Sequence, residues 1–225
     1  MQLSSTKEFY FSIFEKKKLF KFFPNLKNEL LEQYNQILKN SNELKDIDIF
    51  QEYFQTISTG IKDDFYKVSW SISKIKKFIS ENNFSSKDFN LNEIFSDDNS
   101  LNETKSHSYK NTNEINFKPI FISYYQPIET YIVVDGNHRV NEIKRRGIQK
   151  ISGFGLSPYC NEFVMNNFSF NLYKFHHNLV ALHSLCKDPF LWKFKTNKSL
   201  MKNSFYGDNV EFNNLKFKKI IILFN

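Results

Sequence analysis

The sequence has little that would tie it to a disulfide scaffold, a membrane or a secretion route. Its two cysteines, Cys160 and Cys186, form no CxxC pair, so neither a disulfide framework nor a zinc-ribbon spacing is present. No run approaches the roughly 20 apolar residues of a membrane span. The first 23 residues lack the uninterrupted apolar segment of a signal peptide. We therefore expect a cytoplasmic protein with reduced thiols and no membrane partner.

Glycine and proline are also scarce, with 6 and 5 residues in a chain of 225. The sequence contains no Walker loop, dinucleotide-binding glycine pattern, catalytic serine elbow or zinc-finger spacing. The best-known nucleotide-binding and hydrolase signatures are thus absent. A functional site has to be sought in a less common pattern.

Aromatic residues and positive charge are abundant. Aromatics make up 17% of the chain, and 26 of them are phenylalanines, which is enough to fill a sizeable core. The formal net charge is +7 and the sequence pI is about 9.2. This balance favours anionic partners such as a nucleotide or a nucleic acid. A lysine-rich surface that serves only solubility would give the same balance.

Residues 1–65 are predicted to form a helical N-terminal extension. Apolar residues recur at spacings of three and four over 26–38, directly after Pro24, where helices tend to begin. A second stripe over 49–57 predicts another helix, which would end at Gly60.

Residues 66–158 are predicted to form an α/β domain around a small mixed sheet. Alternating or β-branched runs predict strands over 68–72, 119–124, 130–134 and 151–156, with a turn or short helix over 73–78 and a helix from 137 to 146 that stops at Gly147. The continuous β-branched run at 130–134 is typical of a strand buried on both faces. Residues 96–115 are almost entirely polar and predict a flexible insertion.

Residues 159–225 are predicted to be a helical C-terminal extension that ends in a strand over 217–224. Three histidines, His176, His177 and His183, fall near Cys186. A zinc site there is imaginable, but the spacing matches no common metal motif. We therefore favour a packing role for these histidines.

The residues with the most chemical potential follow the strand at 130–134. A buried strand that runs into a tight turn and a helix offers unpaired amides and a positive helix dipole to an anion. Gly136 removes a Cβ from the approach, and the amides of Asn137, His138 and Arg139 are the candidate phosphate donors. Asp135 could hold Mg²⁺ or accept a proton.

Two side chains on this turn could take a direct part in the chemistry. The guanidinium of Arg139 can bind two phosphate oxygens, and His138 could donate to phosphate or act as an acid or base.

Each residue also has a structural interpretation. Asp135 could simply cap the helix, and Arg139 could pair with Asp135 or with Glu142. His138 could pack beneath the turn, but the combination on one turn favours function.

The segments Lys118–Ile122, Tyr131–Val140 and Gly147-Ile148 together resemble the ParB/sulfiredoxin superfamily, in its ParB-like nuclease-domain branch. The stretch 68–95 is similar to the opening box of that family, with an asparagine-led segment at Asn82-Asn83. The resemblance covers roughly residues 66–158. It implies a sulfiredoxin-like fold with a phosphate-handling pocket in the strand–turn–helix core.

The resemblance does not imply one activity. Members include CTP-hydrolysing DNA clamps, an ATP-dependent sulfinic-acid reductase, serine kinases and nucleases. The reductase branch needs a cysteine where this chain has Asn137, and the DNA clamps carry a helix-turn-helix that residues 159–225 do not show clearly. The kinase-like branch implies a base at Asp135 and a second acid in the opening box, which falls on Glu81.

Taken together, the sequence favours a phosphate-handling enzyme. The expected catalytic residues are Asp135, His138, Arg139 and Glu81, with Asp135 as the metal ligand and Gly136, Asn137, His138 and Arg139 as the phosphate site. The activity would be that of a nuclease or other hydrolase, or of a nucleotide-dependent phosphotransferase. Mg²⁺ and ATP or CTP are the expected cofactors. The alternative is a non-catalytic module that binds a nucleotide or DNA.

Overall fold

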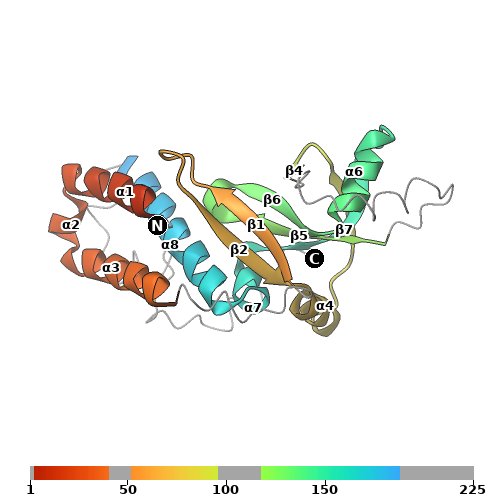
Figure 1. The fold of residues 1–225 in the computed structure, drawn as a ribbon, viewed down its shortest axis with the longest axis horizontal. Coiled ribbons are helices and arrows are strands. Elements are labelled where there is room, and N and C mark those ends of the chain that lie inside the picture. Colours follow the sequence, from red (N-terminus) through yellow and green to blue (C-terminus); the bar gives the residue numbers. More distant parts are fainter. Residues whose placement is uncertain (1–2, 41–51, 96–117, 188–225) are drawn as a thin grey trace. The chain divides into compact units, whose positions relative to one another are not determined.

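The computed structural model describes residues 3–40, 52–95 and 118–187. These residues form an α/β protein with a five-stranded mixed sheet, a two-stranded sheet and helical extensions (Figure 1). They divide into two compact units, of which the first comprises 3–40, 56–68 and 167–187 and the second comprises 52–55, 69–95 and 118–166. No helix in the described ranges is long and apolar enough to cross a membrane.

The first unit is mainly helical. It contains α1 (Ser4–Lys16), α2 (Leu19–Phe22), α3 (Pro24–Lys39) and α8 (Asn167–Lys187), and α1 and α3 both pack against α8. The helix predicted over 26–38 is confirmed by α3. Its apolar stripe is buried, and Pro24 occupies the first turn, where the missing amide is not needed.

The helix predicted over 49–57 is wrong. Residues Glu52–Ser58 form strand β1, which pairs with β2 (Phe65–Ser71). Burial alternates at the end of β1, where Gln55 and Ile57 point inward. The run is rich in aromatic and β-branched residues, which favour strands. Its apolar residues fit both a helical and a strand periodicity, and pairing with β2 selects the strand. The N-terminal part is therefore not entirely helical.

A carboxylate far along the chain caps the first helix. Asp64, in the turn between β1 and β2, accepts hydrogen bonds from the backbone amide of Leu3 at 3.2 Å and from that of Thr6 at 2.9 Å. Its Oδ2 also accepts from the Thr6 hydroxyl at 2.8 Å. The amides of Leu3 and Thr6 at the start of α1 are thus satisfied by a tertiary contact.

The histidines of α8 contact aromatic side chains. His176 Nδ1 lies 2.8 Å from the Tyr66 hydroxyl, and both residues are buried. The ring of His177 stacks on Tyr173, and that of His183 meets Tyr10 edge-on. Burial, with a smaller contribution from the neighbouring His177, lowers the pKa of His176 from 6.5 to about 4. His176 is therefore neutral in the folded protein at neutral pH.

This burial predicts acid sensitivity of the helical unit. Between pH 6.5 and 4 the unfolded chain binds more protons at His176 than the folded chain, so the free energy of unfolding falls as the pH falls. We expect a loss of about 2 kcal/mol between pH 7.5 and 5 in urea unfolding followed by far-ultraviolet circular dichroism. His176→Gln should flatten this dependence and His183→Gln should change it less. An unchanged slope in His176→Gln would contradict the assignment.

The second unit is built on the five-stranded sheet. Its strand order is β3-β7-β5-β6-β4, in which β3–β7 and β5–β6 are antiparallel while β7–β5 and β6–β4 are parallel. The strands are β3 (Lys87–Asn90), β4 (Ile94–Phe95), β5 (Ile120–Tyr125), β6 (Thr130–Asp135) and β7 (Lys150–Leu156). The helices of this unit are α4 (Ile72–Glu81), α6 (Asn137–Arg145) and α7 (Asn161–Val164). Two short 3-10 helices, η3 (Gln126–Ile128) and η4 (Pro158–Cys160), complete it.

The strands predicted over 68–72, 119–124, 130–134 and 151–156 and the helix over 137–146 are all confirmed. The segment 73–78, predicted as a turn or a short helix, lies in helix α4, and the side chain of Ser71 accepts a hydrogen bond from its first turn. The two edge strands β3 and β4 were not predicted. The polar segment 96–115 and the strand predicted over 217–224 lie outside the described residues.

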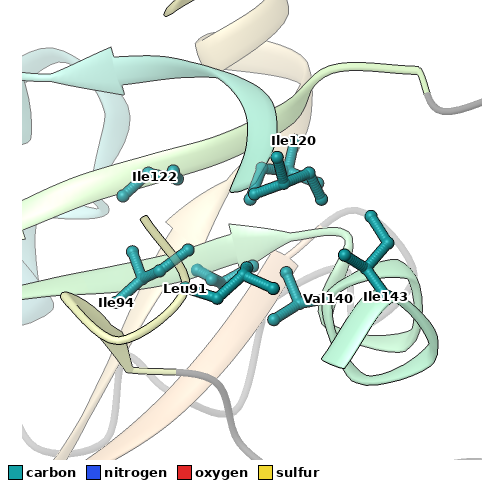
Figure 2. Close-up of a cluster of buried hydrophobic side chains, with 8 residues drawn as sticks. Leu91, Ile94, Ile120, Ile122, Val140 and Ile143 are labelled. Atoms are coloured by element: carbon teal, nitrogen blue, oxygen red, sulfur yellow. The ribbon is translucent and has the colours of Figure 1, made fainter. Parts of the chain in front are cut away.

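One apolar cluster joins the sheet to helix α6. It contains Leu91, Ile94, Ile120, Ile122, Val133, Val140, Ile143 and Ile151, all buried, with Phe89 and Tyr131 packed against it. Figure 2 shows Val140 and Ile143 of α6 facing the strand residues. The stripe of α6 that carries these two residues is thereby removed from water, which fixes the helix on the sheet.

A buried amide connects β5 to β2. The Oδ1 atom of Asn161 accepts hydrogen bonds from Trp70 Nε1 at 3.0 Å and from the Ser123 hydroxyl at 2.8 Å. All three side chains are fully buried. Neither donor could turn to water if this acceptor were lost.

We expect Asn161→Ala to lower the free energy of unfolding by about 2–4 kcal/mol, because it leaves two buried donors unsatisfied. Chemical unfolding followed by tryptophan fluorescence would measure the change. Asn92→Ala, which removes the same side chain from an exposed position, should change stability by less than about 0.5 kcal/mol. Equal effects of the two substitutions would show that the buried amide does not contribute.

Candidate functional site

The predicted strand–turn–helix is present in the second unit. Strand β6 lies between β5 and β4, and its residues Ile132 to Val134 are buried, as expected for a strand covered on both faces. It ends at Asp135, Gly136 turns the chain with a φ of +101°, and α6 begins at Asn137. The N-cap residue of this helix is Gly136, which has no side chain to cap it. Helix α6 ends at Arg145 with Arg146 as its C-cap, and Gly147, where the sequence predicted the stop, follows with a φ of +73°.

Gly136 is required by its protein surroundings. A Cβ built there would lie 2.4 Å from Ile120 Cγ2 and 2.9 Å from Arg139 Nη2. The side of the turn that the sequence suggested a ligand could approach is therefore occupied by Ile120 and Arg139. The positive φ is a second reason for glycine, since other residues rarely adopt it.

Comparison of the two glycines beside α6 distinguishes the effect of the positive φ from the effect of the close contacts. Both have a positive φ, but a Cβ at Gly147 would meet nothing within 4 Å. We expect Gly147→Ala to cost about 1 kcal/mol from backbone strain alone. Gly136→Ala should cost about 3 kcal/mol or more, because overpacking is added. Chemical unfolding of both variants measures the difference, and equal losses would contradict the contact with Ile120.

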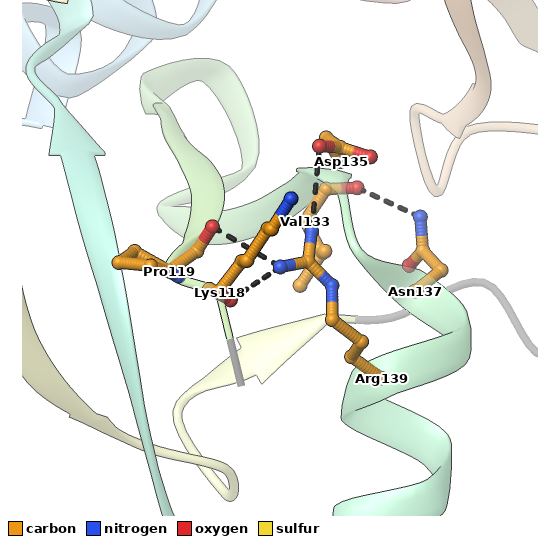
Figure 3. A network of polar contacts seen from close by, with 6 residues as sticks. All are labelled: Lys118, Pro119, Val133, Asp135, Asn137 and Arg139. Carbon is orange, nitrogen blue, oxygen red and sulfur yellow. Dashed lines mark hydrogen bonds and ion pairs between the residues drawn. The ribbon is translucent and has the colours of Figure 1, made fainter. Parts of the chain in front are cut away.

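Arg139 holds the turn together. Its Nη1 donates to the backbone carbonyls of Lys118 and, at 3.3 Å, Pro119, while its Nη2 donates to Asp135 Oδ2 at 3.4 Å (Figure 3). Only 13% of its side chain is exposed. Arg139 thus ties α6 to the segment that enters β5. Of the two partners considered from the sequence, it pairs with Asp135.

The remaining residues of the turn have different environments. The Asp135 side chain is 41% exposed, so its carboxylate is open to solvent while Arg139 contacts one side of it. The Asn137 side chain is buried and donates to the carbonyl of Val133 at 3.1 Å. His138 is half-buried.

Glu81 is not brought to the turn by any contact in the described residues. It is the last residue of α4, is exposed, and forms an ion pair with Lys77 at 3.8 Å. A pair so exposed contributes little to stability. The second acid that the resemblance implied stays a prediction without support from the geometry.

Glu142 plays a part that its sequence context did not suggest. The sequence suggested it as a possible partner of Arg139, yet Glu142 is only 8% exposed and pairs with two other arginines. Its carboxylate accepts from Arg145 at 2.6 and 2.9 Å and from Arg146 at 2.7 Å. These hydrogen bonds lower the pKa of Glu142 from 4.5 to about 2. The three-and-four spacing was the available signal.

Metal chemistry at this turn would depend mainly on Asp135. Within the described ranges, no group of three or more histidine, cysteine or acidic residues could hold a metal ion. One exposed carboxylate suits Mg²⁺ that is bound together with substrate phosphates, since this ion is commonly held by one or two carboxylates and by the phosphates themselves. It does not suit a metal held by protein ligands alone.

Comparisons with known proteins do not assign the turn. No protein-family model matches the chain, and neither a curated protein nor a solved structure matches it. The likeness to the ParB/sulfiredoxin superfamily therefore depends on the motif residues themselves. A function for this chain has to be argued from the chemistry and geometry of the turn.

Proposed function

We propose that the turn at Asp135–Arg139 binds a phosphate of a nucleotide or a nucleic acid and promotes its hydrolysis or transfer. The observation that carries the proposal is the exposed carboxylate of Asp135, directly before a helix whose N-cap residue is a glycine. The ParB-like motif residues agree with this proposal, as does the basic charge of the chain.

The amides at the start of α6 would bind the phosphate. The amides in the first turn of a helix point outward from it, and the helix dipole adds roughly half a positive charge at this end. Together they favour an anion at this position. Gly136 allows the tight turn that brings the carboxylate and the amides next to each other.

Asp135 would be the base, or the ligand of a Mg²⁺ ion that arrives with the phosphate. His138, the next ionisable side chain on the turn, would donate to a phosphate oxygen or act as the acid. The structure suggests a changed role for Arg139, because its guanidinium already bonds two backbone carbonyls. We assign it to positioning Asp135, with its charge acting on the phosphate from behind the turn.

The engagement of Arg139 also favours a second candidate, a non-catalytic module. An arginine that stabilises a transition state usually reaches the reacting phosphate directly. Here the guanidinium contacts the protein, so the turn could bind a nucleotide or DNA without turnover. Binding and turnover must therefore be measured separately.

Two assays on purified protein distinguish these functions. Thermal shift with ATP, CTP and GTP, with and without Mg²⁺, measures nucleotide binding, and incubation with plasmid DNA or RNA measures cleavage. We expect Asp135→Asn to lower turnover about 100-fold or more, the range for a general base, while a nucleotide still shifts its melting temperature. Asp88→Asn, the same change at an exposed position of β3, should leave both measurements unchanged.

Binding without any turnover in the wild-type protein would favour the non-catalytic module. Full turnover in Asp135→Asn would remove Asp135 from the catalytic role. If no nucleotide and no nucleic acid binds, both candidate functions are wrong.

A further inference from the structure

Cationic side chains gather around the end of α6 that is farthest from Asp135. Lys144, Arg145, Arg146 and Lys150 are all exposed residues, and we call this group the α6 basic patch. Arg145 has 59% of its side chain exposed and Arg146 has 28%. These four cations lie within seven residues of chain, and Glu142 pairs with two of them.

Glu142 fixes the positions of the two arginines. Its Oε1 accepts from Arg145 Nη2 at 2.6 Å and from Arg146 Nε at 2.7 Å, while its Oε2 accepts from Arg145 Nε at 2.9 Å. Arginine side chains lose considerable rotamer freedom when they bind a ligand. A buried carboxylate that holds both guanidinium groups in advance reduces that loss.

The two arginines keep donors for a ligand. Among the residues that the structure describes, Nη1 of Arg145 and both Nη atoms of Arg146 have no protein partner. Arg139 differs, because its two Nη atoms donate to backbone carbonyls and to Asp135. A planar guanidinium with free donors suits phosphate oxygens.

The patch is aligned with the proposed phosphate site. Arg139 and Glu142 of α6 and its C-cap residue Arg146 follow one another at spacings of three and four, which places them along one face of the helix, and Asp135 lies just before its start. The nine residues of the helix span about 13 Å. Phosphates of one strand of a duplex follow one another every 3.4 Å or so along its axis. A strand with one phosphate at the turn would therefore bring another to the patch about four nucleotides away.

We infer that the α6 basic patch binds the phosphate backbone of a nucleic acid and that the substrate of the turn is a polynucleotide. A free nucleotide carries its phosphates consecutively at one end and would leave this patch unused. The choice of substrate depends on the proposed function of the turn. Binding to the patch is a separate property that can be tested without turnover.

Fluorescence anisotropy with a labelled 20-base-pair DNA duplex and a labelled single strand of the same length tests the patch at several salt concentrations. The variant replaces Glu142, Arg145 and Arg146 together by Gln, so no buried charge is left unpaired. We expect its affinity for at least one of the two probes to fall about tenfold, with a salt dependence reduced by about two phosphate contacts. Lys76→Gln with Lys77→Gln, exposed lysines of α4, is the charge control.

Two further variants separate positioning from charge and from folding. Glu142→Gln adds one unit of positive charge to the patch, so charge alone predicts tighter binding, whereas loss of the pre-set arginines predicts weaker binding. We expect weaker binding. Lys144→Gln with Lys150→Gln leaves the bonds of Glu142 intact and should also weaken binding. Circular dichroism of each variant checks that it is folded.

Wild-type protein that binds neither probe, or a triple variant that binds as tightly as the α4 control, overturns the inference. The proposed function fails in a different way. If the triple variant loses polynucleotide binding while Asp135→Asn keeps full turnover, the patch stands and the catalytic role of Asp135 does not. If Asp135→Asn loses turnover and the triple variant binds and reacts normally, the reverse holds.

Discussion

The contact of Ile120 and Arg139 with Gly136 is the constraint on which the rest of the turn depends. No Cβ fits between them, so the turn can close only with glycine, and the backbone conformation requires the same residue. Once it closes, Arg139 reaches the carbonyls that enter β5 and the carboxylate that ends β6. Helix α6 is then fixed on its polar side by one guanidinium and on its apolar side by Val140 and Ile143.

Helix α6 has a paired charge group at each end. At its start, Asp135 is open to solvent and Arg139 is nearly covered, whereas at its end Glu142 is covered and the arginines are open. The exposed member decides what each end can attract from solution. A carboxylate beside backbone amides suits chemistry on a phosphate, and guanidinium groups with spare donors suit the binding of one. The same helix could therefore combine the two tasks.

Much of the candidate site could be predicted because its signals are local. The β-branched run of β6, the Asp-Gly break and Gly147 at the helix end are each set by neighbouring residues, and all three were found correctly. The carbonyl partners of Arg139 could not be predicted, because Lys118 and Pro119 lie about 20 residues away and come close to it only through the pairing of β5 with β6. The burial of Glu142 likewise depends on how α6 lies on the sheet. For this reason the sequence could not show that Glu142 holds Arg145 and Arg146 in place.

Local patterns were sufficient to predict the α/β class, the order of most strands and helices, and the position of the turn, because periodicity, chain breaks and caps act within a few residues. Tertiary structure alone decided that 52–58 is a strand, since the segment satisfies two periodic patterns and only β2 supplies a pairing partner. It also decided that Ile120 packs against Gly136 where a Cβ would clash, and that Arg139 donates its hydrogen bonds to the protein. Those outcomes depend on contacts between residues that are far apart in the chain, and local sequence patterns do not specify such contacts.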